Sequence, residues 1–185
     1  VQTCALPIYF ENFFWAGSSL DHFQVVTLAA AVFVALSRRS VGGLAAAAVA
    51  GTAATFTLAQ GLLVWPVAAA LLALQGRRRD LAVWSACAVF AIGCFFTGFG
   101  TNVGHAATDI SGSGLLRVVH FWLQALGSPV ALGNATLAPF LGAALLAILA
   151  TQLRPAVLSR EPIALPLALW AVGSLLLISL GRLEV

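Results

Sequence analysis

The segment that decides the fold is Val41–Gln75, VGGLAAAAVAGTAATFTLAQGLLVWPVAAALLALQ, which contains no acidic or basic residue. Arg38-Arg39 precedes it and Arg77-Arg78-Arg79 follows it. About 35 residues in one helix would reach roughly 52 Å, whereas the hydrocarbon core of a bilayer is about 30 Å thick. Arginines at both borders favour the same, cytoplasmic side of a membrane. We therefore expect a hairpin of two short spans that turns near Gln60-Gly61.

The pattern of apolar runs with arginine borders continues along the chain. The composition is 61% hydrophobic and 8% charged, with a mean hydropathy of +1.02. Ordinary soluble domains carry about 25% charged residues. We therefore predict an all-α fold, a polytopic transmembrane helix bundle of about six spans. The expected spans are about 20–37, 41–59, 61–76, 81–99, 137–152 and 163–181.

The basic residues are all arginines, and their positions predict an orientation. Seven of them fall on one side of the six-span arrangement, and Arg117 and Arg182 fall on the other. By the positive-inside rule, the 100–136 loop lies outside. The loops expected in the cytoplasm are those at Arg38, Arg77 and Arg154. The predicted location is the bacterial inner (plasma) membrane. A nucleic acid is not expected as a partner, because the cations are dispersed over turns.

One segment of the 100–136 loop predicts a helix that does not span the membrane. Leu115–Leu126, LLRVVHFWLQAL, is too short to cross, and its polar residues Arg117, His120 and Gln124 recur at i, i+3 and i+7. On a helix these positions form one narrow polar stripe, which is typical of an interfacial amphipathic helix. We expect this helix at about 115–126, ended by Gly127-Ser128-Pro129.

The first residues of the chain indicate that the sequence is a fragment of a longer protein. The chain contains no methionine, and its first residues, VQTCALPI, match the in-frame translation of a common sequencing-library adapter. We therefore expect residues 1–8 to be an artefact, and the alternative is a native apolar stub. Residues 9–185 would then be a single transmembrane domain fragment of a longer protein.

The polar residues expected on the outer side are candidates for substrate binding. Asp109, Arg117 and His120 would lie at the lipid–water boundary, where an arginine can bind a lipid or sugar phosphate. The alternative is that they form the solvated rim of a membrane protein. The spacing of the outer His and Asp residues matches no metal-binding signature, so we expect neither a metal nor another cofactor.

The hairpin turn supplies two further candidates. Gln60, followed by Gly61 and then Trp65-Pro66, suits an irregular turn that lines a cavity at the outer membrane boundary. The alternative is an interfacial tryptophan anchor followed by a proline that opens a helix. Gln60 and Trp65 thus complete the set of candidate substrate-binding residues, and the catalytic residues remain unknown.

The turn also carries a resemblance. Thr55–Pro66, TFTLAQGLLVWP, with Asn12–Gln24 and Leu180-Gly181-Arg182, resembles segments of uncharacterised bacterial polytopic membrane proteins. Gln60 stands where those proteins usually have asparagine. They in turn resemble the GT-C-type glycosyltransferases, which use lipid-linked sugars, in the layout of their apolar segments. In that class an acidic residue of the first outer loop is used, and no residue of this chain is matched to it.

The resemblance implies a function and leaves two alternatives. The implied function is part of a GT-C-like glycosyltransferase that uses a polyprenyl-phosphate sugar donor, with membrane lipid as a further partner. The alternatives are a subunit of a membrane transporter and a non-catalytic membrane scaffold. Transporters usually place ionisable residues within the membrane. The expected span cores contain none, which argues against ion-coupled transport.

Overall fold

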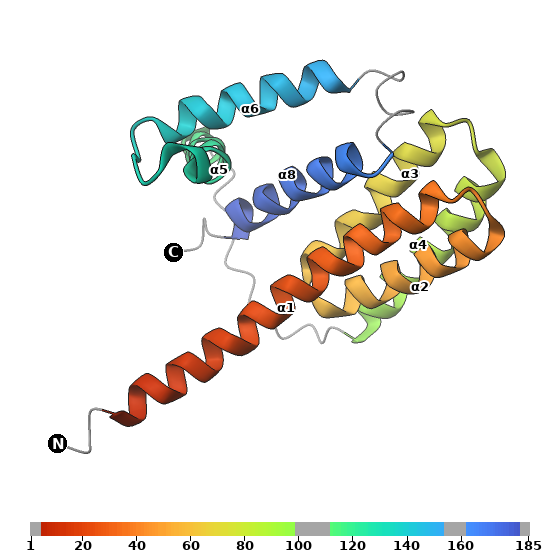
Figure 1. Ribbon diagram of the computed structural model, residues 1–185, viewed down its shortest axis with the longest axis horizontal. Helices are drawn as coiled ribbons and strands as arrows, with labels where there is room; N and C mark the ends of the chain where they lie inside the picture. The colour runs from red at the N-terminus through yellow and green to blue at the C-terminus, as the bar shows by residue number, and fades with distance from the viewer. Residues whose placement is uncertain (1–4, 99–111, 154–161, 182–185) are drawn as a thin grey trace.

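The computed structural model describes residues 5–98, 112–153 and 162–181, and the secondary structure of these residues is entirely helical (Figure 1). The all-α prediction is thus confirmed for this part of the chain. The elements in chain order are α1 (Ala5–Ser37), α2 (Val41–Thr57), the 3-10 helix η1 (Ala59–Leu63), α3 (Val64–Leu74), α4 (Arg78–Gly98), α5 (Gly112–Ala131), α6 (Ala138–Gln152) and α8 (Ala164–Gly181).

Two of these helices are long and apolar enough to cross a membrane, judged by length and composition. They contain the segments Leu20–Ser37 of α1 and Arg78–Thr97 of α4. The other apolar helices, which include the η1–α3 pair, have 10–17 residues each. All of these helices coincide closely with the predicted apolar runs. That each of them crosses a bilayer stays a prediction.

α1 begins earlier than the predicted span. The apolar run starts at Leu20, whereas the helix starts at Ala5 and continues without a break to Ser37. Pro7 lies in the first turn, where a proline costs no intrahelical hydrogen bond. Hydropathy marks where the helix becomes apolar, and it carries no information on where the helical backbone starts.

The turn between α1 and α2 is short because Ser40 caps the second helix. The Ser40 Oγ accepts a hydrogen bond of 3.0 Å from the backbone N–H of Gly43. Gly43 also faces the preceding helix, and a Cβ at this position would crowd the carbonyl oxygen of Ala35. The two helices therefore approach each other closely as an antiparallel pair.

Arg77 joins the end of α1 to the turn between α3 and α4. Its guanidinium group donates to the carbonyl oxygen of Leu36 at 2.8 Å and to the carboxylate of Asp80 at 2.7 Å. A cation beside the last carbonyls of a helix is favourable. The two arginine clusters at 38–39 and 77–79 thus lie at the same end of the bundle, as the hairpin hypothesis requires.

The predicted hairpin is present, and η1 forms its turn. α2 ends at Thr57 and α3 begins at Val64, so that Gln60-Gly61 lies in η1 between them. Gly61 packs directly on α2, and a Cβ there would overlap the backbone of Ala54. Only a glycine allows this approach, which explains why the turn forms at this position.

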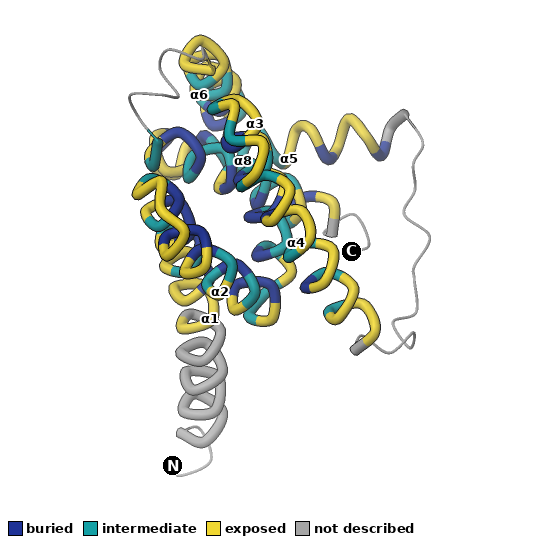
Figure 2. The backbone as a smooth tube through the Cα atoms, turned by 90° about the vertical axis from the view of Figure 1, so that its right-hand side faces the viewer, coloured by how far each residue is buried: buried dark blue, intermediate teal, exposed yellow. Residues whose placement is uncertain are grey.

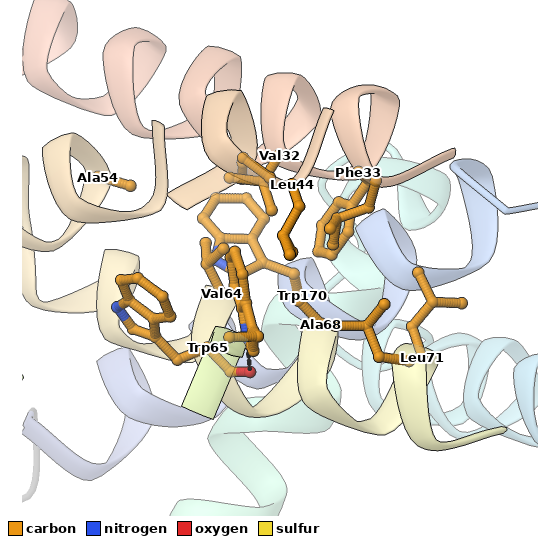
Figure 3. Close-up of a cluster of buried hydrophobic side chains, with 14 of the residues drawn as sticks. Val32, Phe33, Leu44, Ala54, Val64, Trp65, Ala68, Leu71 and Trp170 are labelled. Atoms are coloured by element: carbon orange, nitrogen blue, oxygen red, sulfur yellow. Dashed lines mark hydrogen bonds between the residues drawn. The ribbon is translucent and has the colours of Figure 1, made fainter. Parts of the chain in front are cut away.

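The core lies between the hairpin and the helices on either side of it. Figure 3 shows side chains of α1, α2, α3 and α8 meeting in one cluster, with Trp65 and Trp170 as its largest labelled members. In contrast, many large apolar side chains on the outer faces of the helices are exposed. Examples are Phe23, Val49, Phe90, Phe140 and Ile148. The bundle is therefore apolar both inside and outside.

α5 differs from the predicted interfacial helix in length. It extends from Gly112 to Ala131, and the expectation that Gly127-Ser128-Pro129 ends it is wrong. Gly127 instead allows α5 to approach α6, because a Cβ there would overlap the carbonyl oxygen of Ala138. Pro129 lies in the last turn, where its missing N–H removes only one intrahelical bond. The helix ends where Leu132 adopts a φ of +47° and Gly133 a φ of +87°.

α5 lies across the direction of its neighbours. In Figure 1 it is seen almost end-on, whereas α1, α6 and α8 extend across the view. After the rotation in Figure 2, α5 extends lengthwise. It also lies at the end of the bundle opposite the α1–α2 and α3–α4 turns (Figure 1).

The close approach of η1 to α2 leads to a first prediction. Gly61→Ala should lower the free energy of unfolding by about 1–3 kcal/mol, because the new Cβ must displace the backbone of Ala54. Unfolding by SDS in mixed micelles measures this change. Gly93→Ala is the matched control, since a Cβ at Gly93 meets nothing within 4 Å. The control should be neutral or more stable by up to about 1 kcal/mol. Equal effects of the two variants would contradict this packing.

Candidate functional site

Trp65 is a buried member of a hydrogen-bond chain. Its indole Nε1–H donates to the Thr55 Oγ1 at 2.8 Å, and the same hydroxyl donates to the carbonyl oxygen of Gly51 at 2.9 Å. Both side chains are essentially unexposed. A buried indole N–H without an acceptor would be costly, and Thr55 supplies that acceptor from the facing helix. The first leg of the hairpin is thereby joined to the second.

Trp84 extends this series of hydrogen bonds to α4. Its Nε1–H donates to the carbonyl oxygen of Trp65 at 3.0 Å, and the two rings pack with centroids 4.5 Å apart and an interplanar angle of 41°. Gly51 faces both rings, and a Cβ there would contact each of them at 3.3–3.4 Å. The pair therefore fills the space that a glycine leaves on α2.

Gln60 is held at the hairpin turn through its backbone. Its carbonyl oxygen accepts a hydrogen bond of 3.1 Å from the Nε1–H of Trp170 on α8. The Gln60 side chain is partly exposed. Within the described ranges no hydrogen bond of its amide is present, so the amide group can bind another molecule at this end of the bundle.

Arg117 and His120 lie on the exposed surface of α5. On the opposite face of this helix, Trp122 donates its Nε1–H to the carbonyl oxygen of Val172 at 3.0 Å. Val172 is only two residues from Trp170, which contacts the hairpin turn. α8 therefore brings α5 and η1 to the same level of the bundle.

The candidate residues thus divide into three groups. Gln60 is partly exposed and Arg117 and His120 are exposed, and their elements contact α8 two residues apart, at Trp170 and Val172. Trp65 is enclosed by packing, and its N–H is already used. Asp109 lies outside the described residues. Binding of a substrate by any of these residues stays a prediction.

Two apolar grooves lie between helices of the bundle. One lies between α6 and α8, has a volume of about 500 Å³, and is lined by apolar side chains with Gln152 as the exception. The other lies between α2 and α4 and has a volume of about 660 Å³. Among the described residues, no group of three or more His, Cys, Asp or Glu side chains could hold a metal ion.

Sequence reasoning missed four residues that organise this region. Thr55, Trp84 and Trp170 have their roles only through partners on other elements, which the sequence does not show. Ser174, one helical turn after Trp170, has a buried hydroxyl with no hydrogen-bond partner in the described part of the chain. Trp84 and Trp170, each inside an apolar run, were the available signal, because a buried indole N–H requires an acceptor.

Comparison of the chain with known protein families, with characterised proteins and with solved structures finds no significant match.

The hydrogen bond between Trp65 and Thr55 leads to a second prediction. Thr55→Val keeps the shape of the side chain but leaves the indole N–H without an acceptor, so the free energy of unfolding should fall by about 1–3 kcal/mol. Thr57→Val is the control, because the Thr57 hydroxyl bonds only to Ala53 of its own helix. Its effect should stay within about 0.5 kcal/mol. If both variants unfold at the same SDS concentration, the bond contributes nothing to stability.

Proposed function

We propose that the chain is an integral membrane domain in which α1, α2, the η1–α3 pair, α4, α6 and α8 each cross the bilayer. The apolar outer faces of these helices support this, because soluble monomers rarely expose contiguous apolar patches of more than a few hundred Å². The shorter helices reach about 25 Å at 1.5 Å per residue. Local thinning of the bilayer and flanking polar residues can accommodate such a mismatch.

The proposed orientation places the arginine turns in the cytoplasm of a bacterial cell. The turns at 38–39 and 77–79 are joined by Arg77 and lie at the end opposite α5. By the positive-inside rule that end is cytoplasmic, and the end with η1 and α5 is outside. The membrane is then the bacterial inner membrane.

α5 is the observation that carries the functional proposal. It lies across the bundle with Arg117 and His120 exposed, while its other face holds α8 through Trp122. An amphipathic helix in this position suits the outer lipid–water interface. An arginine there can bind the phosphate of a lipid.

We therefore propose that the domain belongs to a GT-C-like glycosyltransferase that uses a polyprenyl-phosphate sugar donor and an envelope acceptor. Arg117 would bind the donor phosphate, and Gln60, His120 and Asp109 would contact the sugar. The resemblance of Thr55–Pro66 to polytopic bacterial proteins supports the enzyme class.

The orientation is tested with single cysteines. In a chain whose own cysteines are replaced by serine, Ser128→Cys on the exposed surface of α5 should react with a membrane-impermeant maleimide in intact cells. Arg79→Cys, exposed at the opposite end, should react only after the membrane is permeabilised. The reverse labelling pattern would contradict the proposed orientation, and labelling of both in intact cells would contradict the crossing.

The transferase function is tested in bacterial membranes that contain the chain. Labelled sugar from a polyprenyl-phosphate donor should enter an envelope acceptor faster than in membranes without the chain. Arg117→Gln should reduce this rate several-fold, because the donor phosphate loses its cation. Arg79→Gln, at the other end of the bundle, should leave it unchanged. Equal transfer with and without the chain would overturn the proposal.

A further inference from the structure

The end of the bundle opposite α5 carries a strong excess of positive charge. Arg38-Arg39 lies in the turn between α1 and α2, and Arg77-Arg78-Arg79 lies in the turn into α4 (Figure 1). In the described part of these two turns, Asp80 is the one acidic residue. Five arginines against one aspartate give the two turns a formal charge of +4.

Most of this charge is not neutralised by the protein. Arg77 and Asp80 form an ion pair of 2.7 Å, and the Arg77 side chain is only 13% exposed. Arg38, Arg39 and Arg78 are exposed, and within the described ranges their side chains make no hydrogen bond or ion pair. Like charges held near one another repel, so an anion bound between the two turns would lower the energy of this end.

The two turns meet at the carbonyl oxygen of Leu36. This oxygen accepts the backbone N–H of Arg39 at 3.3 Å and the guanidinium group of Arg77 at 2.8 Å. Arg78 follows Arg77 directly and begins α4. Arg39 and Arg78 are therefore exposed cations from two different turns, and they lie on either side of one fixed junction.

Exposed apolar side chains border these cations. Val41, the first residue of α2, is 87% exposed, and Leu74, the last residue of α3, is 56% exposed. A free phosphate or a nucleic acid would leave both side chains in water. An acidic phospholipid has a phosphate for the arginines and acyl chains for the apolar side chains next to them. The neighbouring surface thus favours a lipid over a soluble anion.

We propose that Arg39 and Arg78 bind the phosphate of an acidic phospholipid in the cytoplasmic leaflet, while Arg77 holds the two turns together. The inference rests on the proposed crossing of the bilayer by α2 and the η1–α3 pair, and it does not depend on the transferase activity. The positive-inside rule gives this end only a side of the membrane, whereas the proposal gives it a ligand.

The test is fluorescence quenching of the full chain in lipid nanodiscs. A bimane is attached at Val41→Cys in a chain whose own cysteines are replaced by serine. The probes are phosphatidylglycerol and phosphatidylcholine, each with a nitroxide high on one acyl chain, compared at equal mole fractions. The relative association of phosphatidylglycerol at Val41 should exceed that of phosphatidylcholine at least tenfold. With the bimane at Phe56→Cys, exposed at the other end of α2, the two lipids should quench equally.

Variants of the two arginines test the site itself. Arg39→Gln combined with Arg78→Gln should reduce the preference at Val41 at least tenfold, because about fivefold is lost with each cation. Arg39→Lys combined with Arg78→Lys keeps the charge and should retain most of the preference. Both side chains are exposed, so unfolding by SDS should not change. If the glutamine pair unfolds more easily, Arg39→Gln alone replaces it and should lose about fivefold.

The possible failures can be told apart. Equal quenching by the two lipids at Val41 would overturn the lipid site and leave the crossing intact. No quenching by either lipid at Val41 and at Phe56 would refute the crossing itself, and the site with it. Replacing chloride by inorganic phosphate at equal ionic strength should leave the preference unchanged. Its loss would mean that the arginines take a free anion, which overturns the lipid. Absence of sugar transfer would refute the transferase and leave the lipid site standing.

Discussion

Hydrogen bonds from tryptophan side chains hold the separate elements of this bundle together. Trp65, Trp84, Trp122 and Trp170 each donate an indole N–H to an oxygen on a different element. A buried donor without an acceptor is costly, so each bond fixes a particular helix pair at a particular level. In the proposed bilayer, the apolar surfaces alone would not do this, because lipid tails would compete equally well for them. The positions of η1 and α5 both depend on these bonds.

These bonds explain why an irregular turn is tolerated between α2 and α3. η1 lies against α2 without a side chain at Gly61, and its Gln60 carbonyl oxygen is bound by Trp170. Backbone groups that leave the regular helix are thus satisfied by protein. The Gln60 side chain is left partly exposed at the same level as α5. The packing that holds η1 against α2 and α8 therefore also leaves the polar side chain of Gln60 partly exposed.

The sequence predicted most of the helices well, because α2, α3, α4, α6 and α8 coincide with apolar runs, whereas α1 begins before its run and α5 is longer than its amphipathic segment. The hairpin turn could also be predicted, since arginines at both borders and a length too great for one crossing favour a turn near Gln60-Gly61. The end of α5 could not be predicted from the sequence. Gly127 is a common helix-stop signal, and its role in packing on Ala138 becomes visible only when α6 is in place. Trp65 was interpreted as part of a cavity-lining turn or as an interfacial anchor, and its hydrogen-bond acceptor in the structure, Thr55, is ten residues earlier on the facing helix.

The sequence predicted which residues form the candidate site, but it did not predict how they are arranged in space. Arg117 and His120 are at helical spacing in the sequence, and the structure places them on the exposed surface of one helix. That α5 and η1 share a level follows from Trp170 and Val172, two neighbouring contacts on α8 that no local pattern indicates.

If the short hairpin of α2 and α3 lies in lipid as proposed, spin labels on α2 will report a gradient of accessibility along the helix. Val41, Val49 and Phe56 are exposed along α2 at its start, middle and end. In lipid vesicles, labels placed one at a time should show the highest accessibility to oxygen and the lowest to a water-soluble nickel chelate at position 49. Equal nickel accessibility at all three positions would mean that α2 is in water, and it would contradict the membrane account.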